Sequence, residues 1–277
     1  MDFINDFLTF PFLRNACLAA VLAAIAAGVT GSLVVVRRST YLAGAVSHSL
    51  LAGVGFSLLL TKRFSLPFLP PMAGAVIVAV AVALLLSWLS RTRKFRSDSV
   101  LSAVWTGGMA LGVTFVALTP GYQEDLMSYL FGSLLLVSVK DLTLMAVMDL
   151  GIVITMVFCY NTFLSIAFNE ELARLRGVRT GFYEALYHVL AALTIVLLVQ
   201  VTGIILAVAL LTLPAATAGL ISKRLNRMMV TSVILGTVLS LVGLVISYIW
   251  DLPAGATIVE LSIFVYLSTA VCLRKFV

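Results

Sequence analysis

The sequence predicts an all-α, polytopic membrane protein, a helical bundle with about eight or nine transmembrane helices. Hydrophobic residues make up 62% of its 277 residues and charged residues only 11%, whereas a soluble domain carries roughly a quarter charged residues. Continuous apolar runs of about 20 residues recur along the chain, which is the length that a helix needs to cross a bilayer. Because these runs do not alternate with polar residues, they do not fit the strands of a membrane β-barrel.

Nine apolar segments are the expected spans, and together they form a single transmembrane domain over residues 1–277. They are residues 12–36, 41–60, 71–90, 99–118, 142–163, 182–201, 204–221, 228–250 and 256–273. The count falls to eight if 204–221 only re-enters the membrane. The shorter run 126–137 is expected to be an interfacial or re-entrant helix, because it cannot cross the hydrocarbon core.

Basic residues in short loops predict the orientation, because Lys and Arg collect on the cytoplasmic side. Placing the N-terminus outside and the C-terminus inside leaves only Arg14, Lys62, Arg63 and Lys140 outside. The inside set is Arg37, Arg38, Arg91, Arg93, Lys94, Arg96, Arg174, Arg176, Arg179, Lys223, Arg224, Arg227, Arg274 and Lys275. The net charge of +6 therefore reflects membrane topology, and no nucleic-acid partner is expected.

Small residues at four-residue spacing predict faces where helices pack closely. Ala24, Gly28 and Ser32 form such a face in the first span, and Gly108 and Gly112 form one in the fourth. Small side chains let helix backbones approach each other in lipid. We expect ordinary packing within the bundle at these faces rather than a dimer interface.

His48 is an ionisable residue at membrane depth, where such residues are costly and are candidates for function. Gly44, Ala52 and Gly55 share its helical face, so we expect His48 to point into the bundle or into a cavity. A neutral imidazole is a good ligand for zinc, manganese or iron. The alternative is a histidine that forms a hydrogen bond with a neighbouring helix.

Five further residues at membrane depth or near a helix end are chemically notable. Glu184 and His188 are one turn apart, and a local Glu–His hydrogen bond is expected there rather than a metal site. Asp149 and Glu260 lie within apolar spans, and each could line an ion pathway or pair with another buried group. Pro214 also lies within a span, where it removes a backbone hydrogen bond and predicts a kinked or broken helix beside a pathway.

A charged island, residues 169–180, lies between two long apolar runs. It contains Glu170, Glu171, Arg174, Arg176 and Arg179 at helix-like spacing. Because charges are scarce elsewhere in the chain, this grouping indicates an element that is presented to the aqueous phase on the cytoplasmic side.

These segments, taken in order, resemble the permease subunits of manganese/zinc/iron ABC importers. They are residues 31–38, the Ser47-His48-Ser49 triplet, residues 129–133, the charged island, residues 203–218 and residues 252–259. The resemblance covers nearly the whole chain. It implies the all-helical fold shared with vitamin B12 and siderophore permeases, a place in the bacterial inner membrane, and import of zinc or manganese, or of iron.

The same resemblance implies the partners. Two permease subunits, identical or a related pair, would form the pathway along their interface. Two ATPase subunits would bind the cytoplasmic loops, and an extracellular binding protein would deliver the metal. The chain contains no G-x-x-x-x-G-K-[ST] motif, which P-loop ATPases use to hold phosphates, so it is not expected to be an enzyme and ATP belongs to the partner. No permanently bound cofactor is implied, and the divalent metal is the cargo.

In such permeases a short cytoplasmic coupling helix fits a cleft on the ATPase. It carries an acidic residue, an alanine and a following glycine, which here are Glu171, Ala173 and Gly177, and the helix is expected near residues 169–178. Asn169 can cap its start, while Glu170 and Glu171 favour its positive end. Ala173 permits close approach, and Gly177 can end the helix in a left-handed turn.

One position departs from the family pattern. These permeases usually have an aspartate four residues before the histidine, and that residue here is Gly44. Ser47 and His48 remain candidate pathway residues, with His48 as the candidate metal ligand. Either the metal is held more weakly, or Asp149, Glu260 or the second subunit supplies the missing ligand, or the substrate is different.

Three other functions stay open on the sequence. A permease for a metal chelate or heme would have a wider cavity and no ligand role for His48. A secondary metal transporter would work without ATP, through Asp149 and Glu260. An intramembrane protease would use Glu170 and Glu171, which are similar to the glutamate pair of prenyl-protein proteases, but Arg174 is one residue too close and the pair lies in a loop.

Overall fold

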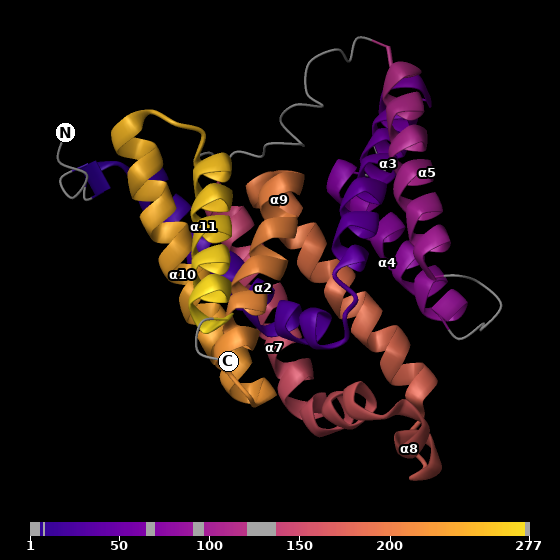
Figure 1. Cartoon of the computed structure of the whole chain (residues 1–277). Helices are drawn as coiled ribbons and strands as arrows, with labels where there is room; N and C mark the ends of the chain where they lie inside the picture. The colour runs from indigo at the N-terminus through magenta and orange to yellow at the C-terminus, as the bar shows by residue number, and fades with distance from the viewer. Residues whose placement is uncertain (1–5, 8, 65–69, 91–96, 121–136, 275–277) are drawn as a thin grey trace. The chain divides into compact units, whose positions relative to one another are not determined.

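A computed structural model describes residues 6–7, 9–64, 70–90, 97–120 and 137–274, and the regular structure within these ranges is helical (Figure 1). Eight of the described helices are long and apolar enough to cross a membrane, which confirms the predicted class. The helices are α2 (Pro11–Val36), α3 (Tyr41–Phe64), α4 (Pro71–Ser90), α5 (Ser97–Ala117), α7 (Val139–Phe168), α8 (Glu170–Leu175), α9 (Thr180–Ile221), α10 (Leu225–Trp250) and α11 (Ala254–Arg274). The predicted interfacial piece 126–137 lies outside the described residues except for Val137.

Helix α9 joins two of the predicted spans. Its 42 residues would measure about 63 Å if straight, which is roughly twice the thickness of the hydrocarbon core. The backbone is non-helical at Gly203, where φ is 76° and ψ is 169°. This break divides α9 into arms 180–202 and 204–221, which correspond to the predicted spans 182–201 and 204–221, and each arm is long enough to cross the membrane.

The sequence predicts the irregular backbone at Pro214, whereas the structure has it at Gly203. Residues with a Cβ are excluded from the backbone conformation of Gly203, which only glycine adopts readily. Pro214 keeps a helical backbone, because its fixed φ is compatible with a helix and membrane helices tolerate proline. It is buried, and its Cβ would lie 3.8 Å from a Cβ placed on Gly236, so it packs against α10.

The chain divides into two compact units. The first unit comprises Met1–Arg38, Met127–Cys159 and Leu197–Val277, and the second comprises Ser39–Leu126 and Tyr160–Val196. Helices α7 and α9 each contribute one end to each unit. The second unit contains both α3, which carries His48, and α8, which lies in the charged island.

In the first unit, α2 packs against α10, and α10 packs against α11. A Cβ on Gly28 would lie 2.7 Å from the backbone nitrogen of Val233, and a Cβ on Gly236 would lie 3.3 Å from the Cβ of Ala24. Ser32, on the same face of α2, is buried and donates a hydrogen bond to the carbonyl of Gly28. The predicted small-residue face of the first span therefore serves packing within the chain.

In the second unit, α3 packs against both α4 and α5 (Figure 1). Gly53 of α3 meets Gly74 of α4 at backbone contact. On the other side of α3, a Cβ on Gly108 would lie 2.5 Å from the Oγ of Ser49. A Cβ on Gly112 would lie 2.6 Å from the carbonyl carbon of Leu51. The predicted Gly108/Gly112 face thus fixes how α5 lies on α3.

Candidate functional site

The charged island forms α8, a short helix whose N-terminus is capped by a side chain. The side-chain Oδ1 of Asn169 accepts a hydrogen bond of 2.9 Å from the backbone N–H of Leu172, which is the capping interaction that the sequence predicts. Glu170 and Glu171 lie in the first turn, where the unsatisfied N–H groups favour negative charge. Glu170 also pairs with Arg174 one turn later at 3.7 Å.

The end of α8 is equally well defined. Gly177 has φ of 82°, which is the left-handed conformation that glycine adopts without steric cost. Its N–H donates to the carbonyl of Arg174, and the N–H of Val178 donates to the carbonyl of Ala173. This pair of hydrogen bonds is the Schellman motif that closes helix C-termini. Because both ends are capped, these six residues form a stable helix, although an isolated helix of this length would be unstable in water.

The side chains of α8 face in two directions. Ala173 is only 2% exposed, so its small side chain lets α8 lie close to its own chain and does not face outward. The part of Ala173 in docking a partner stays a prediction. Leu175 and the preceding Phe168 are 85% and 84% exposed. The outer surface of this element thus combines apolar side chains with charged ones.

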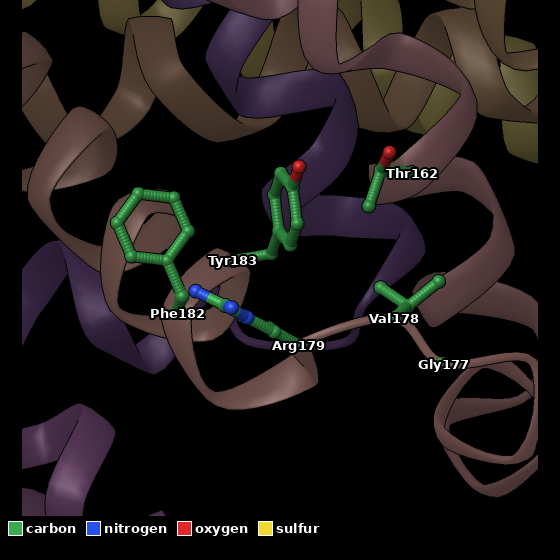
Figure 2. Close-up of a pocket in the computed structure, with 6 residues that line it drawn as sticks. All are labelled: Thr162, Gly177, Val178, Arg179, Phe182 and Tyr183. Carbon is green, nitrogen blue, oxygen red and sulfur yellow. The ribbon is translucent and has the colours of Figure 1, made fainter.

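A pocket of about 400 Å³ lies directly beyond the end of α8 (Figure 2). Gly177, Val178 and Arg179 line it from the loop, together with residues at the end of α7 and the start of α9. The residues from those helices are Thr162, Phe182 and Tyr183. The Arg179 side chain extends from the loop toward Phe182 (Figure 2). This concave surface, with one cation and two aromatic rings, adjoins the outward face of α8.

The first turns of α9 connect the pocket to the foot of α3. Tyr183 packs edge-on against Phe163 of α7. One turn later, Tyr187 is buried, and its hydroxyl forms a hydrogen bond with the hydroxyl of Ser39, just before α3. The next residue, His188, lies with Nδ1 2.8 Å from the carbonyl oxygen of Glu184 and 3.8 Å from its carboxylate. The predicted local Glu184–His188 pair is therefore present.

His48 is half-buried on α3, where its ring stacks on Trp105 of α5. The ring centroids are 4.8 Å apart, and the ring planes differ by 15°. Gly44 is buried beneath the same tryptophan. The neighbouring Ser47 is fully buried, and its hydroxyl has no hydrogen-bond partner among the described residues. The neighbouring helix therefore contacts His48 through an aromatic ring, and the hydrogen bond that the sequence offered as an alternative stays a prediction.

The two carboxylates within apolar spans have different surroundings. Asp149 on α7 is only 4% exposed, and neither of its oxygens has a hydrogen-bond partner in the part of the chain that the structure describes. A buried polar group without a partner is costly. Glu260 on α11 is exposed. Within the described ranges, no three His, Cys, Asp or Glu side chains gather where they could hold a metal ion.

Sequence reasoning did not single out three features that the structure makes prominent. Trp105 covers His48, Gly203 breaks α9, and Phe168 and Leu175 are exposed beside the capped helix α8. The position of Gly203 between two predicted spans was the available signal for the break. For Trp105, the sequence offered no such signal.

The fold and these features define a multi-pass helical membrane protein with a capped element outside the spans. The chain belongs to the ABC 3 transport family, whose sequence profile matches residues 9–273. This family membership and the eight candidate spans confirm a membrane transport protein of the predicted class.

Individual relatives extend this similarity over almost the full length. A probable metal transport system membrane protein from Chlamydia trachomatis is 36% identical, with 90% of this chain and 84% of the relative aligned. The manganese transport system membrane protein MntC of Halalkalibacterium halodurans is 30% identical over 93% of this chain and 86% of its own. Among solved structures, PsaBC from Streptococcus pneumoniae in complex with Fab superposes with a TM-score of 0.84 at 29% identity, covering 97% of this chain and 94% of the other.

Proposed function

We propose that this chain is the transmembrane subunit of an ATP-binding-cassette importer that moves a divalent transition-metal ion, zinc or manganese, into the cytoplasm of a bacterium. A separate ATPase subunit supplies the energy, a second permease subunit completes the pathway, and an extracellular binding protein delivers the ion. Membership of the ABC 3 transport family supports the class. The names of the relatives, two of them metal transport membrane proteins, support the cargo.

The observation that carries the proposal is the outward face of α8. Phe168 and Leu175 are large apolar side chains that are almost fully exposed beside the ion pair of Glu170 and Arg174. Exposed apolar groups rimmed by charges mark protein contacts. Because α8 is capped at both ends, it presents this surface in a fixed conformation, which lowers the entropy cost of binding. The adjoining pocket with Arg179 offers a second point of attachment.

The second unit can transmit the effect of docking. The loop after α8 leads into α9, and the buried hydroxyl of Tyr187 is bonded to Ser39 at the foot of α3. Helix α3 carries His48, the candidate ligand for the ion in transit. A shift of α8 that the ATPase imposes would therefore also move α3, the helix that carries His48, as in rigid-body coupling between two states.

The docking role is tested by Leu175→Asp in the permease co-expressed with its ATPase. Burial of a leucine side chain is worth about 1.5–3 kcal/mol, so its loss would weaken docking by about 10- to 100-fold. Leu252→Asp is the matched control, because Leu252 is also exposed but lies between α10 and α11. Expected results are normal membrane insertion of both variants, and loss of ATPase co-purification and of ATP-dependent uptake for Leu175→Asp alone.

Two outcomes would contradict the proposal. Normal ATPase co-purification by Leu175→Asp would remove the docking role of α8. Metal uptake by the wild-type chain that continues without ATP or without the ATPase would instead favour a secondary transporter.

A further inference from the structure

Trp105 is held over His48 by close packing between α5 and α3. Gly108, on the same helix as Trp105, lies against Ser49, the residue after His48. The hydroxyl of Ser49, which donates a 2.7 Å hydrogen bond to the carbonyl of Ala45, also lies 3.2 Å from the carbonyl oxygen of Val104. These contacts on either side of Trp105 fix the register of α5 on α3, so the stack of Trp105 on His48 follows from the backbone packing.

The same ring occupies the space of a side chain at position 44. A Cβ on Gly44 would lie 3.1 Å from Cζ3 of Trp105 and 3.4 Å from both Cε3 and Cη2. Contacts at 3.1 Å are tighter than ordinary van der Waals packing, so the ring would have to give by a few tenths of an ångström to admit a side chain here. Residues four apart lie on one helical face, and Trp105 therefore stands where a second ligand beside His48 would stand.

This arrangement leaves His48 as a lone nitrogen ligand on its helical face. Stacking on a flat ring restrains the plane of the imidazole and leaves its edge, with both nitrogens, uncovered by Trp105. Among the described residues, no three His, Cys, Asp or Glu side chains lie close enough together to hold a metal ion. Imidazole suits zinc, iron, copper and nickel, whereas manganese prefers carboxylate and other oxygen ligands.

We propose that Trp105 is a specificity-determining residue: its ring fills the space beside Gly44 where a second ligand would stand, so the His48 site favours nitrogen-preferring ions such as zinc over manganese. This inference rests on the proposed import function. It goes further because it names which class of metal ion the site prefers and which residue determines that preference.

The test is competitive uptake of zinc and manganese into proteoliposomes that contain the permease with its ATPase and binding protein. The double variant Gly44→Asp/Trp105→Ala places a carboxylate on the face of His48 and removes the ring that crowds this position. The ratio of manganese to zinc uptake should rise by about tenfold, the lower end of what changes around metal ligands cause. Gly44→Asp alone should shift the ratio less, because the ring must first move.

Trp105→Ala alone should raise the KM for zinc, because the imidazole loses its restraint without gaining a partner. Trp250→Ala is the matched control, since Trp250 is exposed at the end of α10, and it should leave both the ratio and KM unchanged. If the double variant fails to assemble, Gly44→Asp/Trp105→Phe tests the same point with a smaller ring.

The outcomes separate the two proposals. An unchanged manganese-to-zinc ratio in the assembled double variant would overturn the role of Trp105, as would identical zinc KM values for Trp105→Ala and Trp250→Ala. Absence of ATP-dependent uptake of either ion by the wild-type complex would instead overturn the proposed function.

Discussion

Gly177→Ala should loosen the end of α8 by a predictable amount. A Cβ at this position would meet no atom within 4 Å, so the substitution causes no clash and acts only through the backbone. The φ of 82° costs a residue with a Cβ about 1 kcal/mol. Because α8 has only six residues, this cost is a large part of its local stability.

The assay is amide hydrogen exchange of the permease in nanodiscs. A loss of about 1 kcal/mol raises the open population about fivefold, so exchange over residues 172–178 should accelerate about fivefold, and affinity for the ATPase should fall by a similar factor. Gly177→Asn should restore most of both properties, because asparagine tolerates the left-handed region.

Gly151→Ala is the matched control, because a Cβ there also meets no atom within 4 Å while the residue lies inside helix α7. Alanine is favoured over glycine in a helix by roughly 0.5–1 kcal/mol, so this variant should exchange no faster than the wild type. If Gly177→Ala exchanged at the wild-type rate over 172–178, the left-handed closure would not be what stabilises α8.

Three other substitutions test the fold around the site. Gly108→Val should drive α5 off Ser49 and destabilise the protein by about 1–3 kcal/mol, which a thermal-shift assay would register as a lower Tm, whereas an unchanged Tm would contradict the close contact. Gly203→Ala should lower the free energy of unfolding by about 1–3 kcal/mol, since the backbone conformation at this position suits only glycine, and the Tm of the protein should fall. An unchanged Tm would mean that the break in α9 does not require glycine. Tyr187→Phe should remove the bond to Ser39, worth about 1 kcal/mol, and should lower transport-coupled ATP hydrolysis while leaving ATPase co-purification intact; normal coupling would rule out this connection.

The spans and the capped helix could be predicted because each depends on short-range rules. Continuous apolar runs report membrane crossing wherever they pack, and Asn169 and Gly177 define the ends of α8 through local hydrogen bonds. The inward face of Ala173 depends on how α8 lies against its own chain. Six residues contain too few turns for a pattern to reveal that.

The surroundings of His48 could not be predicted because they depend on the register between two helices. Nothing near Trp105 in the sequence relates it to Gly44 or His48. The relation arises because Gly108 lets α5 settle against Ser49 at one position. Likewise, both Pro214 and Gly203 could interrupt α9, and only the three-dimensional structure shows that the glycine does so.

The hydrogen bond between Tyr187 and Ser39 means that a small tilt at the start of α3 becomes a larger displacement further along the helix. Its foot is tied to the segment that follows α8, and His48 lies about nine residues further on, or roughly 13 Å along the helix axis. A tilt of about 10° at the foot would displace the imidazole by about 2 Å at that distance. Such a displacement exceeds the tolerance of a metal–nitrogen bond, so, with His48 as the proposed ligand, a small rotation at the start of α3 would be enough to release the ion.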